Sequence, residues 1–349
     1  MSSPPEFPKY IGGCRYQLLQ LLGYGANGQV FLGLDCRSST KVAIKQLPRR
    51  GLTPHERRIQ DNEASFHQAL SHHHNILTLH CVIEENDALY LVLDYCPMGD
   101  LFEHVVRQTS LQRKSSQEQN RTMALDIISA VMDCHASGIY HRDLKPENIL
   151  LMDNEIRLAD FGLATTERCS SDVGCGSACY MSPECHMPGP KGVDSAKNDV
   201  WSLGIILVNL MSGLNPWKQA SVDDDSFRAY LEDQTYLLRT LGISPTFYHL
   251  LTRALDVDPD MRCSLPELYA LVDSCPTFLA SPLQLKTPPP LVTSDEFNYD
   301  SDSVYTTSSP VNPIFSLPDD LNFDKDGLYA MYFDHTNSMN YLDQLDAEL

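Results

Sequence analysis

The chain has 349 residues, of which 42% are apolar and 21% are charged, a composition typical of globular proteins rather than fibrous or wholly disordered ones. Its 26 basic and 46 acidic side chains give a net charge of −20. Such a charge repels nucleic-acid phosphates and anionic lipids, and no basic patch offsets it. We therefore do not expect the protein to bind nucleic acid or membranes. The length allows two domains or one domain with two lobes.

The chain offers no visible secretory signal and no apolar stretch long enough for a bilayer. Its eleven cysteines follow no regular framework, which favours reduced thiols. We therefore expect a monomeric protein of the cytoplasm, the nucleus or both.

Extended segments come first along the chain. Residues 1–14 are expected to be a flexible N-terminus. Strand-like apolar runs follow at 15–22, 29–35, 41–47, 76–83 and 89–95. Apolar residues at four-residue spacing, as in Leu101 and Val105 or Met123 and Ile127, then predict amphipathic helices. Strands followed by helices predict an α+β fold with two lobes over 15–275.

The last fifth of the chain has a different composition. Residues 281–349 contain ten Asp and two Glu against two Lys and no Arg, and seven prolines. Self-repulsion and polar bulk predict a disordered acidic tail. Aromatic residues lie between its acids, a pattern suited to folding onto a regulatory partner.

A glycine-rich segment, Gly23-Tyr24-Gly25-Ala26-Asn27-Gly28, lies between two predicted strands. A dinucleotide fingerprint would open a helix, so this context favours a hairpin that closes over phosphates. Glycines let the backbone N–H groups approach a polyphosphate. An ordinary hairpin turn is the alternative for this motif alone.

Lys45 lies in the middle of an apolar strand. A buried ammonium needs a carboxylate and an anionic ligand, and Glu63, in a helical stretch, is the expected partner. A surface lysine on an edge strand is the alternative.

A third group of polar residues follows at His141-Arg142-Asp143-Leu144-Lys145-Pro146-Glu147-Asn148 and Asp160-Phe161-Gly162. Phosphoryl transfer requires an oriented hydroxyl, charge neutralisation and oxygen ligands for Mg²⁺. Asp143 suits the hydroxyl, Lys145 the moving phosphoryl group, and Asn148 and Asp160 the metal.

In this order and spacing, the motifs resemble those of eukaryotic protein kinases from about Tyr16 to Cys275. The resemblance implies a bilobal protein kinase fold, with a small β-rich N-lobe and a larger helical C-lobe, and it implies ATP and Mg²⁺ as cofactors. It also implies roles for individual residues. For the phosphates of the nucleotide, the resemblance implies a covering loop of Gly23, Tyr24, Gly25, Ala26, Asn27 and Gly28, and an anchor formed by Lys45 with Glu63. For adenine and ribose, it implies apolar walls at Val30, Ala43 and Leu150, a residue guarding the back of the pocket at Leu93, a hinge from Asp94 to Cys96, and a carboxylate near the ribose at Asp100. Elsewhere it implies Asp143 as catalytic base, Asn148 and Asp160 as metal ligands, Glu184 and Arg262 as a buried ion pair, and Asp199 beneath the catalytic loop.

Lys145 and Ser177 resemble residues of serine/threonine kinases, and the stretches 174–185 and 212–220 resemble the fungal group that includes the fission-yeast repressor of meiosis. This implies transfer of the γ-phosphoryl group of ATP to Ser or Thr of protein substrates, in signalling or in growth and differentiation control. The alternative is a catalytically weak nucleotide-binding scaffold that acts through its tail. Transfer to a small molecule is disfavoured by the segment Ser182 to Glu184, which resembles a peptide-positioning loop.

The activation segment departs from the family pattern, because Val173 replaces the usual phosphorylated Thr. Arg142 normally meets that phosphate. Asp172 would supply the charge instead, or Ser170 or Ser171 would be phosphorylated at a shifted position. We predict activity without phosphorylation of this segment.

Two further expectations concern single positions. His67 lies where the family has an apolar residue, so it is either neutral and packed or a pH-sensitive position on its helix. Asp100, Glu147 and the acidic run 223–225 favour substrates with basic flanking residues, with solvated surface acids as the alternative.

Overall fold

The structure, a computed structural model, describes residues 9–25, 28–111, 116–153, 155–170, 176–187 and 192–280. The chain divides into two compact units, Met1–Pro289 and Pro290–Leu349, and every described residue belongs to the first. The predicted acidic tail, 281–349, lies outside the described residues.

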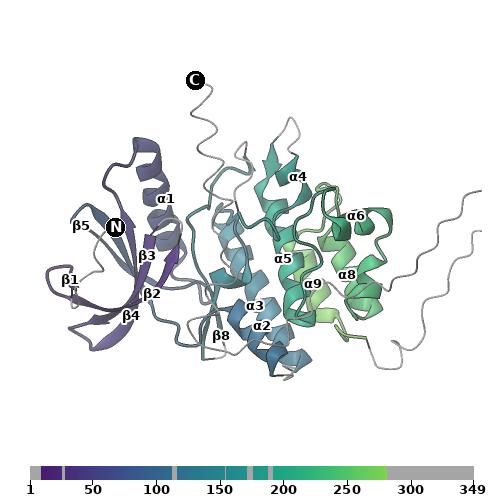
Figure 1. Ribbon diagram of the computed structural model, residues 1–349, viewed down its shortest axis with the longest axis horizontal. Coiled ribbons are helices and arrows are strands. Elements are labelled where there is room, and N and C mark those ends of the chain that lie inside the picture. Colours follow the sequence, from purple (N-terminus) through teal and green to yellow (C-terminus); the bar gives the residue numbers. More distant parts are fainter. Residues whose placement is uncertain are drawn as a thin grey trace, which may run out of the picture. The chain divides into compact units, whose positions relative to one another are not determined.

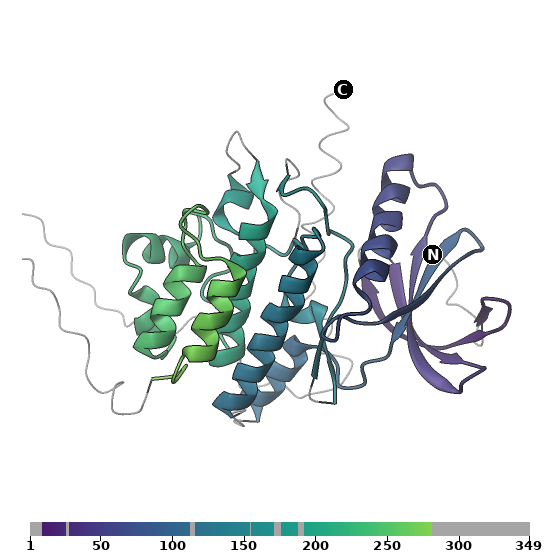
Figure 2. The ribbon, with the colours of Figure 1, turned by 180° about the vertical axis from the view of Figure 1, so that it is seen from behind.

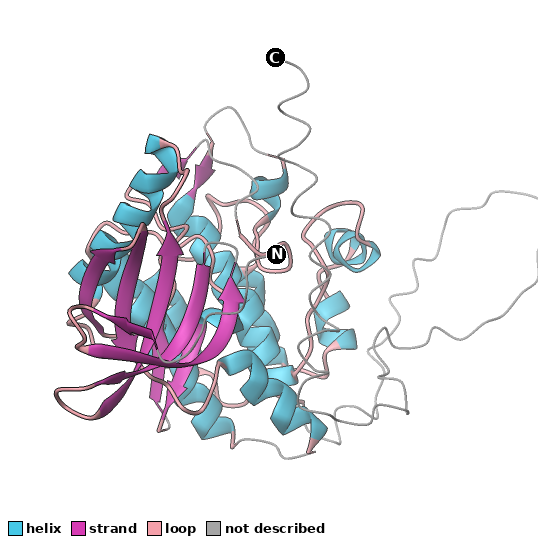
Figure 3. Cartoon of the chain, turned by 60° about the vertical axis from the view of Figure 1, so that its left-hand side comes forward, coloured by secondary structure: helices cyan, strands magenta, loops and turns pink. Residues whose placement is uncertain are grey.

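Strands of the N-terminal lobe form one antiparallel sheet in the order β1-β2-β3-β4-β6-β5 (Figure 1 and Figure 3). One face packs around Ile44 and Tyr90, and the other, around Leu47 and Leu91, packs against helix α1. The five predicted strands of this lobe are confirmed. The bounds are β1 (Lys9–Ile11), β2 (Tyr16–Gly25), β3 (Gly28–Asp35), β4 (Thr40–Pro48), β5 (Leu79–Glu85) and β6 (Ala88–Asp94).

Helices dominate the second lobe, together with short strand pairs (Figure 2). The strands are β7 (Ile149–Met152), β8 (Glu155–Leu158), β9 (Cys169–Ser170) and β10 (Val193–Asp194). The helices of the chain are α1 (Pro54–Leu70), α2 (Leu101–Ser110), α3 (Gln117–Ala136), the short 3-10 turn η1 (Pro146–Asn148), α4 (Pro183–His186), α5 (Ser195–Ser212), α6 (Asp225–Glu232), α7 (Tyr236–Thr240), α8 (Pro245–Ala254) and α9 (Leu265–Ser274).

Local sequence explains where the two most important helices begin. Helix α1 starts with a capping box, in which the Thr53 hydroxyl accepts from the Glu56 amide and the Glu56 carboxylate accepts from the Thr53 amide. Helix α5 is capped by Asp194 and is apolar nearly all round, so it is buried along almost its whole length. Helices α3 and α8 pack against α5, and α9 packs against α3 and α8, in one hydrophobic core.

None of the helices in the described ranges is both long and apolar enough to cross a membrane.

Ordered structure extends beyond the predicted domain, 15–275, at both ends. Within the predicted flexible N-terminus, 1–14, residues Lys9–Ile11 form β1, which pairs with β2, and Ile11 is buried in the sheet core. At the other end the domain continues past 275. The Phe278 ring is fully buried against Phe247, and its amide donates to the Gln117 side chain at 3.0 Å. Neither segment carries a long periodic apolar pattern, so sequence patterns alone could not place these residues in the domain.

Candidate active site

Lys45 connects three elements at the boundary between the lobes. Its ammonium, on β4, lies 2.7 Å from the Glu63 carboxylate on α1 and 2.9 Å from the Asp160 carboxylate after β8. Burial lowers the Lys45 pKa, but the two carboxylates outweigh it and raise the pKa above its usual range. The alternative of a surface lysine is thereby excluded.

Asp160 stays ionised in this arrangement. Burial raises its pKa, whereas the charge and hydrogen bond of Lys45 and the Gly162 amide lower it, and the net result is a pKa of about 2. Its Oδ1 accepts from Lys45 and Gly162. The residue adopts a φ of 63°, which turns the carboxylate toward the lysine.

The glycine-rich segment forms the hairpin of β2 and β3, with Gly23 opposite Val30, Tyr24 opposite Gln29 and Gly25 opposite Gly28. A side chain at Gly28 would place a Cβ 2.0 Å from the Gln46 carbonyl oxygen, so close strand packing requires glycine there. Ala26 and Asn27 lie outside the described residues.

Below the hairpin, one apolar cluster gathers the predicted nucleotide walls. It contains Ala43 and Leu93, with Val30, Cys96 and Leu150 packed against it. The predicted hinge begins at Asp94, the last residue of β6. Asp94 is bonded to His80 at 2.7 Å. Burial raises the pKa of the Cys96 thiol to about 11, so this thiol is neutral.

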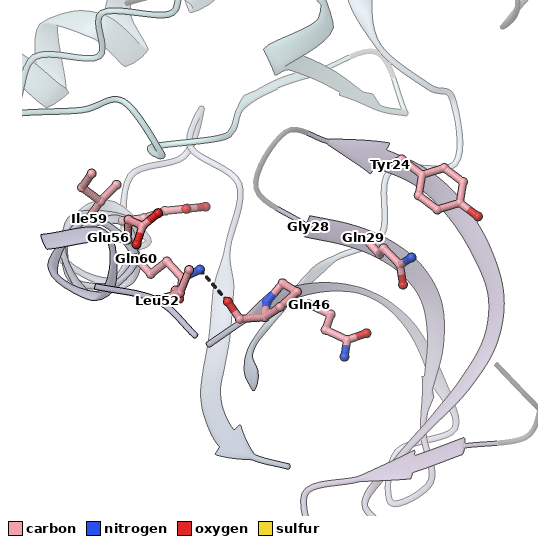
Figure 4. Close-up of a pocket in the computed structure, with 10 residues that line it drawn as sticks. Tyr24, Gly28, Gln29, Gln46, Leu52, Glu56, Ile59 and Gln60 are labelled. Carbon is pink, nitrogen blue, oxygen red and sulfur yellow. Dashed lines mark hydrogen bonds between the residues drawn. The ribbon is translucent and has the colours of Figure 1, made fainter. Parts of the chain in front are cut away.

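Beside Glu63, a cavity of about 600 Å³ opens between α1 and the ends of β3 and β4. Figure 4 shows Ile59, Gln60 and Glu56 on the helix side and Gln29 and Gln46 on the strand side. The Gln60 amide donates to the Pro48 carbonyl at 3.1 Å, which fastens the helix to the end of β4.

The catalytic loop brings Asp143, Lys145 and Ser177 together. The Asp143 carboxylate pairs with Lys145 at 2.8 Å and accepts from the Ser177 amide at 3.1 Å and hydroxyl at 3.2 Å. Lys145 also donates to the Ser177 hydroxyl at 3.0 Å. A carboxylate held in this way is placed to receive a proton from an incoming hydroxyl.

Asn148 and Asp160 have the donor set that Mg²⁺ prefers. Asn148 uses its Nδ2 to donate to the Asp143 carbonyl at 2.8 Å, which fixes the amide with Oδ1 as its remaining acceptor. Within the described part of the chain, no side chain or amide donates to Asn148 Oδ1 or Asp160 Oδ2. The residues present therefore fit a divalent cation.

Asp199, fully buried on α5, holds the catalytic loop from beneath. Its carboxylate accepts from the His141 and Arg142 amides at 2.9 and 2.8 Å and pairs with His135 at 2.8 Å. These bonds stabilise the left-handed backbone of Arg142, whose φ is 64°. Farther down, Glu184 and Arg262 form a bidentate pair at 2.7 and 3.0 Å.

Arg142 makes a contact that the sequence did not reveal. Its guanidinium donates to the Ser170 hydroxyl at 2.8 Å and to the Leu163 carbonyl at 3.0 Å. Ser170 is only 2% exposed and lies in β9, which pairs with β10. Ser171, Asp172 and Val173 lie outside the described residues.

His67 is packed and neutral. It is 2% exposed, and its ring lies 5.0 Å from that of Phe161, which in turn lies 5.2 Å from His141. Burial lowers the His67 pKa to about 4, only partly offset by the bond to the Leu77 carbonyl. The structure therefore favours the neutral interpretation over the pH-sensitive one.

The acidic residues predicted to bind basic substrates differ in their surroundings. Burial raises the pKa of Asp100 to about 6 and also raises that of Glu147, and the two carboxylates repel each other. Asp100 also caps α2 through the Glu103 amide at 2.8 Å. Asp224 and Asp225 are engaged elsewhere, in capping α6 and in pairing with Arg228.

Comparison with known proteins agrees with this geometry. The model of the protein kinase domain matches residues 16–271. The chain belongs to the protein kinase family. This confirms the family expected from the motifs and the bilobal fold that it implies.

Individual relatives of this kinase-family chain are mostly longer proteins. It is 43% identical to the "Negative regulator of sexual conjugation and meiosis" of Schizosaccharomyces pombe, over 82% of this chain and 65% of that protein. It is 37% identical to "Serine/threonine-protein kinase VHS1" of Saccharomyces cerevisiae, over 65% of this chain and 52% of that protein. It is 35% identical to "CBL-interacting serine/threonine-protein kinase 18" of Arabidopsis thaliana, over 73% and 48%. The chain thus spans about half to two thirds of these relatives.

Sequence reasoning did not find every residue that shapes this kinase site. Gly176 has a φ of 114°, and a Cβ there would lie 2.9 Å from the Arg142 carbonyl oxygen, so glycine lets the activation segment approach the catalytic loop. Neither this contact nor that of Ser170 follows a periodic pattern. Only the position of Gly176 directly before Ser177 could have suggested it.

The His67 pKa predicts a pH effect on stability. Because unfolded His67 binds a proton below about pH 6.5 and the folded residue only near 4, the free energy of unfolding should fall as pH decreases between these values. We expect His67→Leu to remove roughly 2–3 kcal/mol of this fall, measured by denaturant titration at several pH values. Parallel pH dependences of the two proteins would contradict the buried, neutral assignment.

Proposed function

We propose that this protein transfers the γ-phosphoryl group of ATP to Ser or Thr hydroxyls of proteins, in signalling or in growth and differentiation control. The main support is that Lys45 pairs with both Glu63 and Asp160. Asn148 brings Asp143 to the same place, since its side chain donates to the Asp143 carbonyl and its own carbonyl accepts from the amide of Ala159, next to Asp160. Each charge that phosphoryl transfer requires is present there. Serine/threonine specificity is supported by the names of two relatives and by Ser177 beside Lys145.

In this mechanism Lys45 binds the α and β phosphates while Glu63 and Asp160 hold its ammonium in place. Asn148 and Asp160 would hold Mg²⁺, which would neutralise developing charge on the phosphates. Asp143 orients the substrate hydroxyl and receives its proton. Lys145, 2.8 Å from Asp143, balances charge on the phosphoryl group as it moves.

We further propose that substrates carry basic residues near the target hydroxyl. Asp100 and Glu147 support this, because both are partly desolvated carboxylates that a substrate cation would stabilise. The tail is proposed to bind a regulatory partner, on the basis of its charge and aromatic residues. We also propose that the protein is a monomer and that it acts in the cytoplasm or the nucleus.

The first prediction concerns catalysis. Positioned proton transfer contributes about 10² to 10⁴-fold, so Asp143→Asn should lower phosphate transfer to a Ser peptide by that factor while Mg·ATP affinity stays unchanged. Radiolabel transfer and calorimetry measure the two quantities. If Asp143→Asn transferred phosphate as fast as the wild type and kept its function in cells, the scaffold alternative would be favoured.

The second prediction concerns activation. Because Ser170 is buried and its hydroxyl accepts a hydrogen bond from Arg142, protein treated with phosphatase should keep its full activity. Ser170→Ala should lower activity by about tenfold, since it removes a hydrogen bond to a charged group. Stoichiometric phosphate on Ser170 or Ser171 in active protein, required for its rate, would refute this.

The third prediction concerns substrate preference. A positional-scanning peptide screen should show enrichment of Arg or Lys near the target residue, and Glu147→Gln should weaken that enrichment by about threefold to tenfold, as expected for an ion pair in a cleft. Asp273, exposed on α9 and outside the predicted acidic residues, provides the matched control, Asp273→Asn. Preference for acidic flanking residues would overturn the proposal.

A further inference from the structure

The C-terminal half of α1 is joined to the following chain by hydrogen bonds from two side chains. His67 Nε2 lies 2.6 Å from the Leu77 carbonyl oxygen. Since a carbonyl only accepts, Nε2 must carry the proton, which fixes the tautomer of the buried ring. One turn later, the Ser71 hydroxyl donates to the His67 carbonyl at 2.7 Å and accepts from the Leu79 amide at 3.0 Å.

These bonds continue into the catalytic lobe through backbone contacts. The Leu77 amide donates to the Leu158 carbonyl at 2.9 Å, and the Leu158 amide donates to the Asn75 carbonyl at 2.8 Å. Leu158 ends β8, two residues before Asp160. The segment that receives the His67 bond is therefore itself hydrogen-bonded to the strand that leads to Asp160.

Glu63 lies one helical turn before His67, and residues four apart share a face of a helix. Movement of α1 away from the sheet would withdraw Glu63 from Lys45 and would break the His67 bond. An apolar side chain at position 67 could pack on Phe161 but could not form this directional bond. The histidine thus adds a hydrogen bond to the ring contact at 5.0 Å.

We propose that His67 and Ser71 form a polar tether that holds α1 where Glu63 pairs with Lys45, so that the ion pair forms without an added activator. His67 and Ser71 are positioning residues, since neither touches the expected nucleotide. The tether rests on the proposed function in one respect, namely that the ion pair of Lys45 and Glu63 serves ATP binding.

Hydrogen exchange of the full chain tests the tether without reference to turnover. His67→Leu removes the donor at similar volume, His67→Gln retains an amide at the position of Nε2, and Ser71→Ala breaks the relay. Ser65→Ala is the matched control, because Ser65 is exposed on α1 and its hydroxyl donates within its own helix, to the Asp61 carbonyl.

We expect His67→Leu and Ser71→Ala each to accelerate exchange over α1 and at the Leu79 amide by about threefold to tenfold, the range for one lost hydrogen bond. His67→Gln should return exchange to within about twofold of the wild type, and Ser65→Ala should have no effect. The affinity for Mg·ATP should weaken in His67→Leu and Ser71→Ala more than in His67→Gln. In each variant it should weaken by no larger a factor than the one by which hydrogen exchange accelerates.

Unchanged α1 exchange in both His67→Leu and Ser71→Ala would overturn the tether, as would equal acceleration in His67→Leu and His67→Gln. If His67→Leu does not fold, Ser71→Ala still decides between these results. A wild type that transfers no phosphate, but whose variants follow the expected exchange pattern, would refute the proposed function and support the tether.

Discussion

The structure depends on one buried cation, the Lys45 ammonium between two carboxylates from different parts of the chain. Desolvating an ammonium costs several kcal/mol, and this cost is offset only when oppositely charged groups are close and well oriented. Glu63 requires α1 to lie against the sheet, and Asp160 requires the segment after β8 to turn through a left-handed backbone. The ion pairs therefore couple the positions of both lobes.

Rigid support from the second lobe makes this arrangement possible. Asp199, buried on α5, accepts from the His141 and Arg142 amides and so fixes the backbone of the catalytic loop directly before Asp143. Arg142 in turn donates to the Ser170 hydroxyl, which attaches the activation segment to the same loop. The site thus combines the two ion pairs of Lys45 with weaker hydrogen bonds that hold the backbone of the catalytic loop and the activation segment.

Much of the fold was predictable, because the apolar periods of the strands and helices extend over many residues. The charged residues of the site were also predictable, since a lysine in an apolar strand and carboxylates after strands have few structural uses. Other features depend on tertiary contacts of one or two residues. The strand at Lys9–Ile11, the packing of Phe278, the Ser170 contact and the Nε2 bond of His67 belong to this class.

The most direct measurement of the central interaction is a double-mutant cycle on Mg·ATP affinity with Lys45→Met, Glu63→Gln and the double variant. If Glu63 acts through Lys45, each single change weakens binding and the double variant is no weaker than Lys45→Met. The coupling energy should then be at least about 1 kcal/mol. Additive losses, or an unchanged affinity in Lys45→Met, would contradict the account.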